Sequence, residues 1–151
     1  MFGNLKCCAA LSSLSAVVCL SGCTITQTAN PAAGISSDVA DICVIEHPDV
    51  NKEFLPALQD SLMRKGFRVN VLEADAAVSA CPLTATYLGK WSWDFVPYMA
   101  YGEIAIYQDG TQIGDALYKS PRGGWALTTR IYESTAEKVG VMVDQLFPTR
   151  P

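Results

Sequence analysis

The amino-acid sequence predicts an α/β (α+β) sandwich, in which a mixed sheet of about five strands is covered by two helices. Three observations lead to this fold class. A strand–helix–strand pattern opens the domain, three long alternating segments follow it, and a second helical pattern closes it ahead of Pro148. The order β-α-β-β-β-α supplies one sheet and enough helix to bury one of its faces.

The first half of the predicted domain is the strand–helix–strand unit. Residues 41–46 form an apolar, β-branched run typical of a buried strand, which His47-Pro48 ends. Residues 51–65 have helical spacing, and Gly66 suits the positive φ that often follows a helix. Their apolar stripe comprises Val50, Phe54, Leu55, Leu58, Leu62 and Met63. Residues 67–73 alternate as a second strand, and we expect a right-handed crossover between the two strands.

The second half is predicted to be a three-stranded meander and a closing helix. The strands occupy residues 83–95, 98–108 and 111–119, and Asp109-Gly110 is a two-residue turn of the kind that joins hairpin strands. Residues 132–147 return to helical spacing. The apolar positions of this helix are Tyr132, Ala136, Val139, Gly140, Val143 and Leu146.

Residues 1–22 have the properties of a secretory signal peptide. Lys6 precedes an uncharged apolar run of about 12 residues, whereas a membrane span needs roughly 20. The run ends in Leu20-Ser21-Gly22-Cys23, which resembles the bacterial lipobox. That resemblance implies cleavage before Cys23 and its modification by acyl chains such as palmitate. Because residue 24 is Thr and not Asp, it also implies the outer membrane. The alternatives are a signal peptide that merely ends near a cysteine, or a buried N-terminal helix.

The domain boundaries follow from this interpretation. Residues 23–38 would be the lipidated cysteine and a flexible linker, since the segment is small, polar and interrupted by Pro31 and Gly34. Residues 39–148 would form a single domain that faces the periplasm, and residues 149–151 a short tail. Exposure of the domain on the cell surface stays open.

The cysteines divide between the signal and the domain. Three of the six leave with the signal peptide, namely Cys7, Cys8 and Cys19. Cys23 is the predicted lipid site. Cys43 and Cys81 then remain in an oxidising compartment, where a structural disulfide is the simplest outcome. A redox or metal pair is the alternative, but the spacing is not Cys-x-x-Cys and the chain has one histidine.

The sequence offers no set of residues that would make a catalytic site. His47 is the single histidine, and no Gly-x-Ser-x-Gly motif accompanies it. Asp94 and Glu103 could face each other across neighbouring strands, although such pairs are more often solvated than catalytic. Fifteen acidic residues against 11 basic ones argue against nucleic acid. We therefore predict a protein that is not an enzyme, with no metal and no cofactor.

Aromatic residues concentrate in the first two meander strands, as Tyr87, Trp91, Trp93, Phe95, Tyr98, Tyr101 and Tyr107. We expect most of them to fill the space between sheet and helices. The predicted core face of the second strand comprises Tyr98, Ala100, Gly102, Ile104 and Ile106, and its more solvated face Met99, Tyr101, Glu103 and Tyr107. The candidate partner-binding surface is Tyr101 and Tyr107, with Lys90 and Asp94 nearby.

Several stretches resemble a family of small, uncharacterised proteobacterial lipoproteins. They are Ile42–Glu46, Trp91–Asp94, Tyr98–Tyr101 and Gln112–Tyr118. That family has no assigned activity, so the resemblance implies a lipoprotein without implying a mechanism. The order of elements and the ending Phe147-Pro148 are also loosely similar to the α/β domain of the curli secretion lipoprotein and to the N-terminal domain of the Tol-system propeller protein. Both are envelope assembly modules, but a fold does not fix a function.

These observations predict a lipid-anchored interaction or assembly module of the Gram-negative envelope that binds another envelope protein. One alternative is an envelope-polymer binding protein or hydrolase that uses the aromatic strand face. Another is a structural lipoprotein that associates with itself through an exposed sheet edge.

Overall fold

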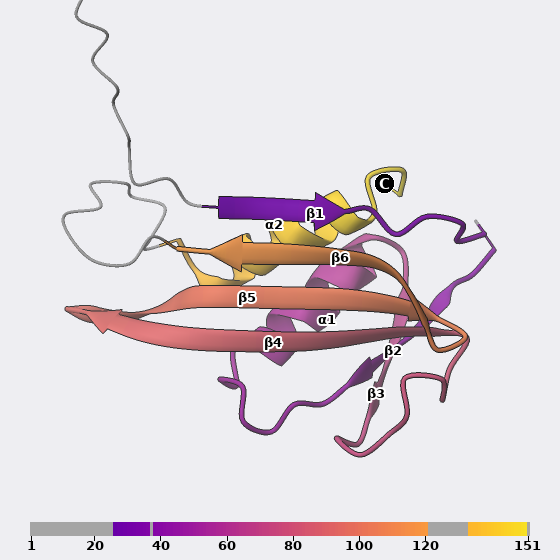
Figure 1. Cartoon of the computed structure of the whole chain (residues 1–151), viewed down its shortest axis with the longest axis horizontal. Helices are drawn as coiled ribbons and strands as arrows, with labels where there is room; N and C mark the ends of the chain where they lie inside the picture. Colours follow the sequence, from indigo (N-terminus) through magenta and orange to yellow (C-terminus); the bar gives the residue numbers. More distant parts are fainter. Residues whose placement is uncertain (1–25, 37, 121–132, 151) are drawn as a thin grey trace, which may run out of the picture.

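The computed structural model of the chain describes residues 26–36, 38–120 and 133–150. These residues form an α+β domain, in which a six-stranded mixed sheet carries both helices on one face (Figure 1). The predicted fold class is confirmed, and the expectation of about five strands was one short. The predicted signal peptide, Cys23 and Tyr132 lie outside the described residues.

The sheet has the strand order β1-β6-β5-β4-β2-β3. In chain order the elements are β1 (Thr26–Asn30), β2 (Asp41–Ile45), α1 (Phe54–Arg64), β3 (Arg68–Leu72), β4 (Leu83–Asp94), β5 (Val96–Gln108), β6 (Thr111–Lys119) and α2 (Thr135–Leu146). The first four strands of the sheet order pair antiparallel, and β2 pairs parallel with both β4 and β3. The predicted β-α-β unit is therefore present, with its two strands adjacent.

The hydrophobic core lies between the sheet and the two helices. Its fully buried members include Ile42, Val44, Phe54, Leu58, Leu62, Ile104, Ile106, Val139, Met142 and Leu146. On α1 the core residues recur every four positions, which is the spacing of one helix face. Met63, which we expected in this stripe, is 54% exposed. One residue turns the helix by about 100°, so the position after Leu62 points to solvent.

Local hydrogen bonds and one glycine mark the ends of the helices. At the start of α1, the Asn51 Oδ1 accepts a hydrogen bond from the Glu53 N–H at 3.0 Å. After its end, Gly66 has φ +80, as expected for the residue that reverses the chain. α2 begins at Thr135, later than the predicted residue 132, because Ser134 and Glu137 form a reciprocal capping box there.

The segment predicted to be a flexible linker contains β1 instead. Thr26–Asn30 pairs antiparallel with β6, where Ala29 lies opposite Ala116. The Ala32 N–H then donates to the Leu146 carbonyl at 2.9 Å, which ties the chain to the end of α2. The physical reason is that β6 would otherwise present unpaired backbone groups, and a threonine-rich segment suits a strand.

A register shift in the β4–β5 ladder corrects the predicted core face of β5. Lys90 pairs with Tyr101 but Trp91 pairs with Met99, so Ala100 has no partner on β4. This extra residue is a bulge, which changes the face on which the preceding side chains lie. Met99, expected on the solvated face, is therefore 1% exposed, whereas Tyr98 and Ala100 are only partly buried. The prediction holds for Gly102, Ile104 and Ile106.

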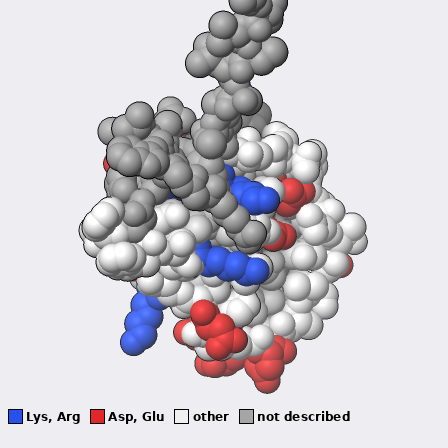
Figure 2. All heavy atoms as spheres, turned by 60° about the vertical axis from the view of Figure 1, so that its left-hand side comes forward, with Lys and Arg blue, Asp and Glu red and all other residues white. Residues whose placement is uncertain are grey.

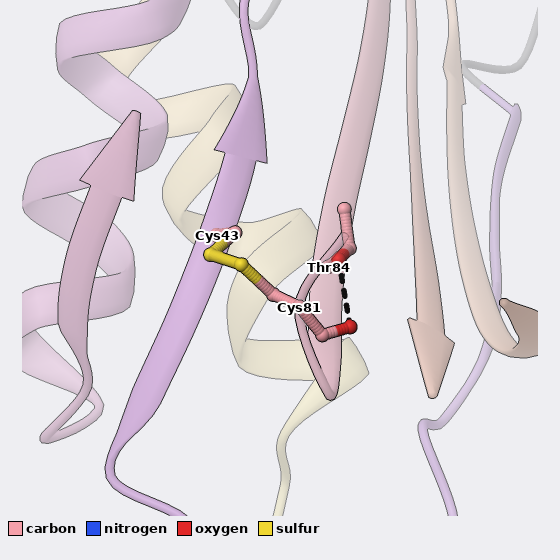
Figure 3. The surroundings of a disulfide bond; sticks show 3 residues. All are labelled: Cys43, Cys81 and Thr84. Atoms are coloured by element: carbon pink, nitrogen blue, oxygen red, sulfur yellow. Dashed lines mark hydrogen bonds between the residues drawn. A yellow bond between two sulfur atoms is a disulfide. The ribbon is translucent and has the colours of Figure 1, made fainter. Parts of the chain in front are cut away.

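The predicted disulfide between Cys43 and Cys81 is present. It joins β2 to the segment just before β4, with the two Cα atoms 6.2 Å apart (Figure 3). Beside it, the Thr84 hydroxyl donates to the Cys81 carbonyl at 3.4 Å. The β2–β4 ladder is short, with pairs at Cys43–Thr84 and Val44–Ala85. The disulfide thus reinforces the shortest strand pairing of the sheet.

Candidate functional site

The predicted surface lies on the sheet face opposite the helices, and the structure brings only part of it together. Lys90 and Tyr101 are neighbours across β4 and β5, and the Lys90 Nζ lies 5.8 Å from the centre of the Tyr101 ring. The Tyr101 hydroxyl donates to the Glu103 Oε2 at 2.6 Å. This bond, with smaller effects of burial and of the Glu103 charge, raises the pKa of Tyr101 to about 12.

The other two predicted members do not join this group. Tyr107 is on the same face of β5 but six residues further along, which is about 20 Å. Asp94 lies at the end of β4, although its side chain is outside the described part of the structure. The expected pairing of Asp94 with Glu103 is wrong, because Asp94 lies opposite Val96 and Glu103 opposite Leu88. These two residues therefore do not form a carboxylate pair of the glycosidase type.

The free end of the β4–β5 hairpin exposes three large apolar residues. Trp93 is 70% exposed, Phe95 86% and Val96 47%. The rings of Trp93 and Phe95 lie 6.0 Å apart, and Phe95 turns the chain with φ 60. For Trp93 and Phe95, this corrects the expectation that most aromatic side chains of the first two meander strands fill the core. Sequence reasoning placed the contact residues at Tyr101 and Tyr107, and the overlooked signal was the position of Trp93 and Phe95 at the end of a strand.

A small pocket of about 150 Å³ lies where the hairpin meets the start of α2. Its lining includes Trp91, Tyr98, Glu53 and Glu133. The Thr135 hydroxyl donates to the Glu53 Oε2 at 3.0 Å, which joins the beginnings of the two helices. The pocket is therefore bounded by the bulged part of the sheet and by both helices.

Next to this region, Lys138 of α2 is 2% exposed. Its Nζ donates to the Met99 carbonyl at 3.3 Å and lies 5.1 Å from the Tyr118 ring centre and 5.9 Å from that of Tyr98. Burial lowers the pKa of Lys138, and the charges of neighbouring glutamates oppose this change. A lysine of lowered pKa can act as a base. Here, however, the ammonium group satisfies the carbonyl beside the bulge. No sequence pattern pointed to this lysine, since lysines on helices are normally exposed.

His47 follows β2, as predicted, and is half-buried. Its backbone N–H donates to the Tyr87 hydroxyl at 3.1 Å. Among the described residues, no group of three His, Cys, Asp or Glu side chains could hold a metal ion. Within the same ranges, neither helix has the length and apolar character required to cross a bilayer.

No family model matches the sequence, and no curated protein matches it. Solved structures that share the fold include two of PelC dodecamers from Paraburkholderia phytofirmans. One, of a PelC point variant, has a TM-score of 0.52 at 12% identity, over 82% of this chain and 95% of that chain. The second PelC dodecamer has a TM-score of 0.51 at 15% identity, over 82% and 94%. A PDZ domain protein from Parabacteroides distasonis gives a TM-score of 0.43 at 9% identity, over 88% of this chain and 38% of that protein. At these identities the likeness to PelC is one of fold.

Proposed function

We propose that this protein is a lipid-anchored, non-enzymatic assembly module of the Gram-negative cell envelope. The observation that carries the proposal is the incorporation of β1 into the sheet. Thr26 is the third residue after Cys23. An acylated Cys23 would therefore hold the folded sheet itself close to the membrane, whereas a long flexible linker would have left the domain free to move away from it.

The lipobox-like sequence supports the anchor, and two further features support assembly. PelC, whose fold this domain shares, forms a dodecamer. In the described sheet, β1 and β3 are the outer strands, and outer strands are ready templates for pairing with another chain. We propose that the partners of this module include further copies of the chain, alongside another envelope protein.

Metabolic labelling with palmitate tests the anchor. The wild type should incorporate label and fractionate with the outer membrane, and Cys23→Ala should incorporate none. Cys19→Ser is the matched control, because it changes a nearby cysteine and leaves Leu20–Cys23 intact. Equal labelling of wild type and Cys23→Ala, or a wild type that fractionates as a soluble protein, would refute the proposal.

Native mass spectrometry of the full chain, extracted from membranes in detergent, tests self-assembly. We expect a defined oligomer in which every copy carries acyl chains. A monomer at all concentrations would remove self-association and leave a module that binds other envelope components.

A further inference from the structure

The apolar end of the β4–β5 hairpin points the same way as the N-terminal end of β1. Thr26 lies opposite Lys119, Lys119 opposite Tyr101, and Tyr101 opposite Lys90. These four residues form one row across the sheet. The hairpin continues past this row, and in Figure 1 its tip and the start of β1 are at the same, left-hand end of the domain.

The chain from Thr26 to Cys23 is long enough to match the extent of the hairpin to Trp93 beyond that row. Trp93 is the third residue after Lys90, which places it about 10 Å beyond the row at the rise of a strand. Cys23 is the third residue before Thr26, so it can also extend at most about 10 Å. A bilayer that holds the acyl chains of Cys23 is therefore within reach of the hairpin tip.

The chemistry of the tip suits a lipid headgroup region. Trp93, Phe95 and Val96 are exposed apolar side chains, and tryptophan favours the membrane–water interface. Lys90 and Lys119 are exposed in the row behind the tip, from which long side chains can reach lipid phosphates. Asp94 is the acidic residue of the tip, and a carboxylate favours a position among the headgroups over one among the acyl chains. Figure 2, which brings this end forward, shows basic side chains near the middle of the view, acidic side chains to the right of the upper one, and a further acidic group at the lower edge.

We propose that the hairpin tip, residues 93–96, is a second membrane contact, which inserts Trp93, Phe95 and Val96 into the phospholipid leaflet that holds the acyl chains of Cys23. The inference rests on the proposed function, because the lipid anchor brings the tip to the bilayer. Two attachment points, one covalent and one apolar, would fix the orientation of the sheet relative to the membrane. The apolar contact would add to the hold of the acyl chains and would therefore slow desorption further.

The experiment uses the full chain, purified from membranes and reconstituted into vesicles of phosphatidylethanolamine and phosphatidylglycerol. Intact mass spectrometry first establishes whether Cys23 carries acyl chains. Brominated phospholipids then quench tryptophan fluorescence, and the difference between the wild type and Trp93→Ser isolates the contribution of Trp93. A triple variant (Trp93→Ser, Phe95→Ser, Val96→Thr) removes the apolar tip. The matched control is Met63→Ser with Val141→Ser, which replaces exposed apolar residues of the two helices, 54% and 44% exposed.

We expect bromolipid quenching in the wild type and in the helix control, and its loss in Trp93→Ser. Transfer of the triple variant between vesicles should be roughly tenfold or more faster than that of the wild type. All variants should melt near the wild-type temperature, since the changed side chains are exposed. An acylated protein with no quenching at Trp93 and no change in transfer rate would overturn the inference and leave the proposed function standing. A mass that shows no acyl chain on Cys23 would overturn both. Shielding of Trp93 by a second copy, seen as a fluorescence change on dilution to monomers without vesicles, would also overturn the membrane contact.

Discussion

The β4–β5 hairpin carries aromatic residues both toward its base and at its tip, and the two sets lie in opposite environments. Toward the base, Tyr87 is buried, and Trp91, two residues before Trp93, packs against the core. At the tip, Trp93 continues the same alternation along the strand and Phe95 follows in the turn, but both are largely exposed. Strand alternation therefore determines the face on which an aromatic side chain lies, and only the helices decide whether that face is covered.

The covering element at the base is the first turn of α1. The Phe54 ring stacks on Tyr87 at 5.0 Å and meets Trp91 edge-on at 6.3 Å. A Cβ at Gly89 would lie 3.0 Å from the Phe54 ring, so the glycine allows this close approach. The Asp109 N–H donates to the Pro82 carbonyl at 2.9 Å, next to the disulfide at Cys81. The base is thus held by packing, hydrogen bonding and a covalent link, and the exposed tip is available for contact.

The largest difference between the two ends should appear on truncation of an aromatic residue. Tyr87→Ala should lower the free energy of unfolding by about 3–5 kcal/mol, because it empties a buried site beneath Phe54. Trp93→Ala on the same strand should change it by less than about 0.5 kcal/mol. Urea denaturation followed by circular dichroism measures both. Similar losses in the two variants would show that the tip is packed and would break the comparison.

Loss of the disulfide should have the next largest effect. Replacing both Cys43 and Cys81 with serine should lower the free energy of unfolding by about 3–4 kcal/mol, given the sequence separation of 38 residues. The wild type should be destabilised by a reductant, and the double variant should be insensitive to it, which is the internal control. Two free thiols in the denatured, unreduced protein would contradict the link.

The sequence was sufficient for the fold class, the order of the elements from β2 to α2, and the disulfide. Buried positions at helical spacing, such as Phe54, Leu58 and Leu62, identified α1, and Asp109-Gly110 identified the turn between β5 and β6. Two oxidisable cysteines in the domain were enough for the pairing of Cys43 with Cys81. These features depend on local pattern or on simple chemistry.

The sequence analysis missed the structural features that depend on which elements pack or pair with one another. Thr26–Asn30 is polar and has no hydrophobic alternation, so its strand exists only because β6 offers an edge. The bulge at Ala100 depends on the pairing of β4 with β5 and cannot be detected in β5 alone. The exposure of the hairpin tip follows from the limited extent of the helices. The start of α2 was also misplaced, but the information was present in the sequence, because the Ser134–Glu137 capping box can be recognised there.

A smaller loss of stability is expected from an added methyl group at one of two glycines. Gly114 faces the segment that follows β1, and Gly140 of α2 faces α1. A Cβ at Gly114 would lie 2.7 Å from the Ala32 backbone, so Gly114→Ala must displace the segment that follows β1. We expect a loss of about 1–3 kcal/mol in the free energy of unfolding. Gly140→Ala is the matched control, because its nearest neighbour, the Arg64 guanidinium, is 3.6 Å away. It should be neutral or stabilise the domain by up to about 1 kcal/mol. Faster hydrogen exchange at residues 26–30 in Gly114→Ala alone would locate the change, and equal behaviour of the two variants would contradict it.

The smallest effect concerns Tyr101, in the row of residues behind the tip. Its hydrogen bond to Glu103 raises the pKa from 10.0 to about 12 in the folded protein. The unfolded chain therefore releases this proton first as the pH rises. The bond contributes its full stability below pH 10 and loses it as the pH approaches about 12. Between these values the free energy of unfolding should fall less steeply for Tyr101→Phe than for the wild type.

Unfolding in urea at several alkaline pH values measures this difference. Burial raises the pKa of Tyr87 and Tyr118 as well, but both contribute equally to the two proteins and cancel in the comparison. Glu103→Gln retains the phenol and removes the charged acceptor, so its slope should lie between the other two. Trp93→Ala should keep the wild-type slope, because the tip and the open face are separate surfaces. A shallower slope in Trp93→Ala would show that the tip holds Tyr101 in place, and the two ends of the hairpin would then no longer be independent.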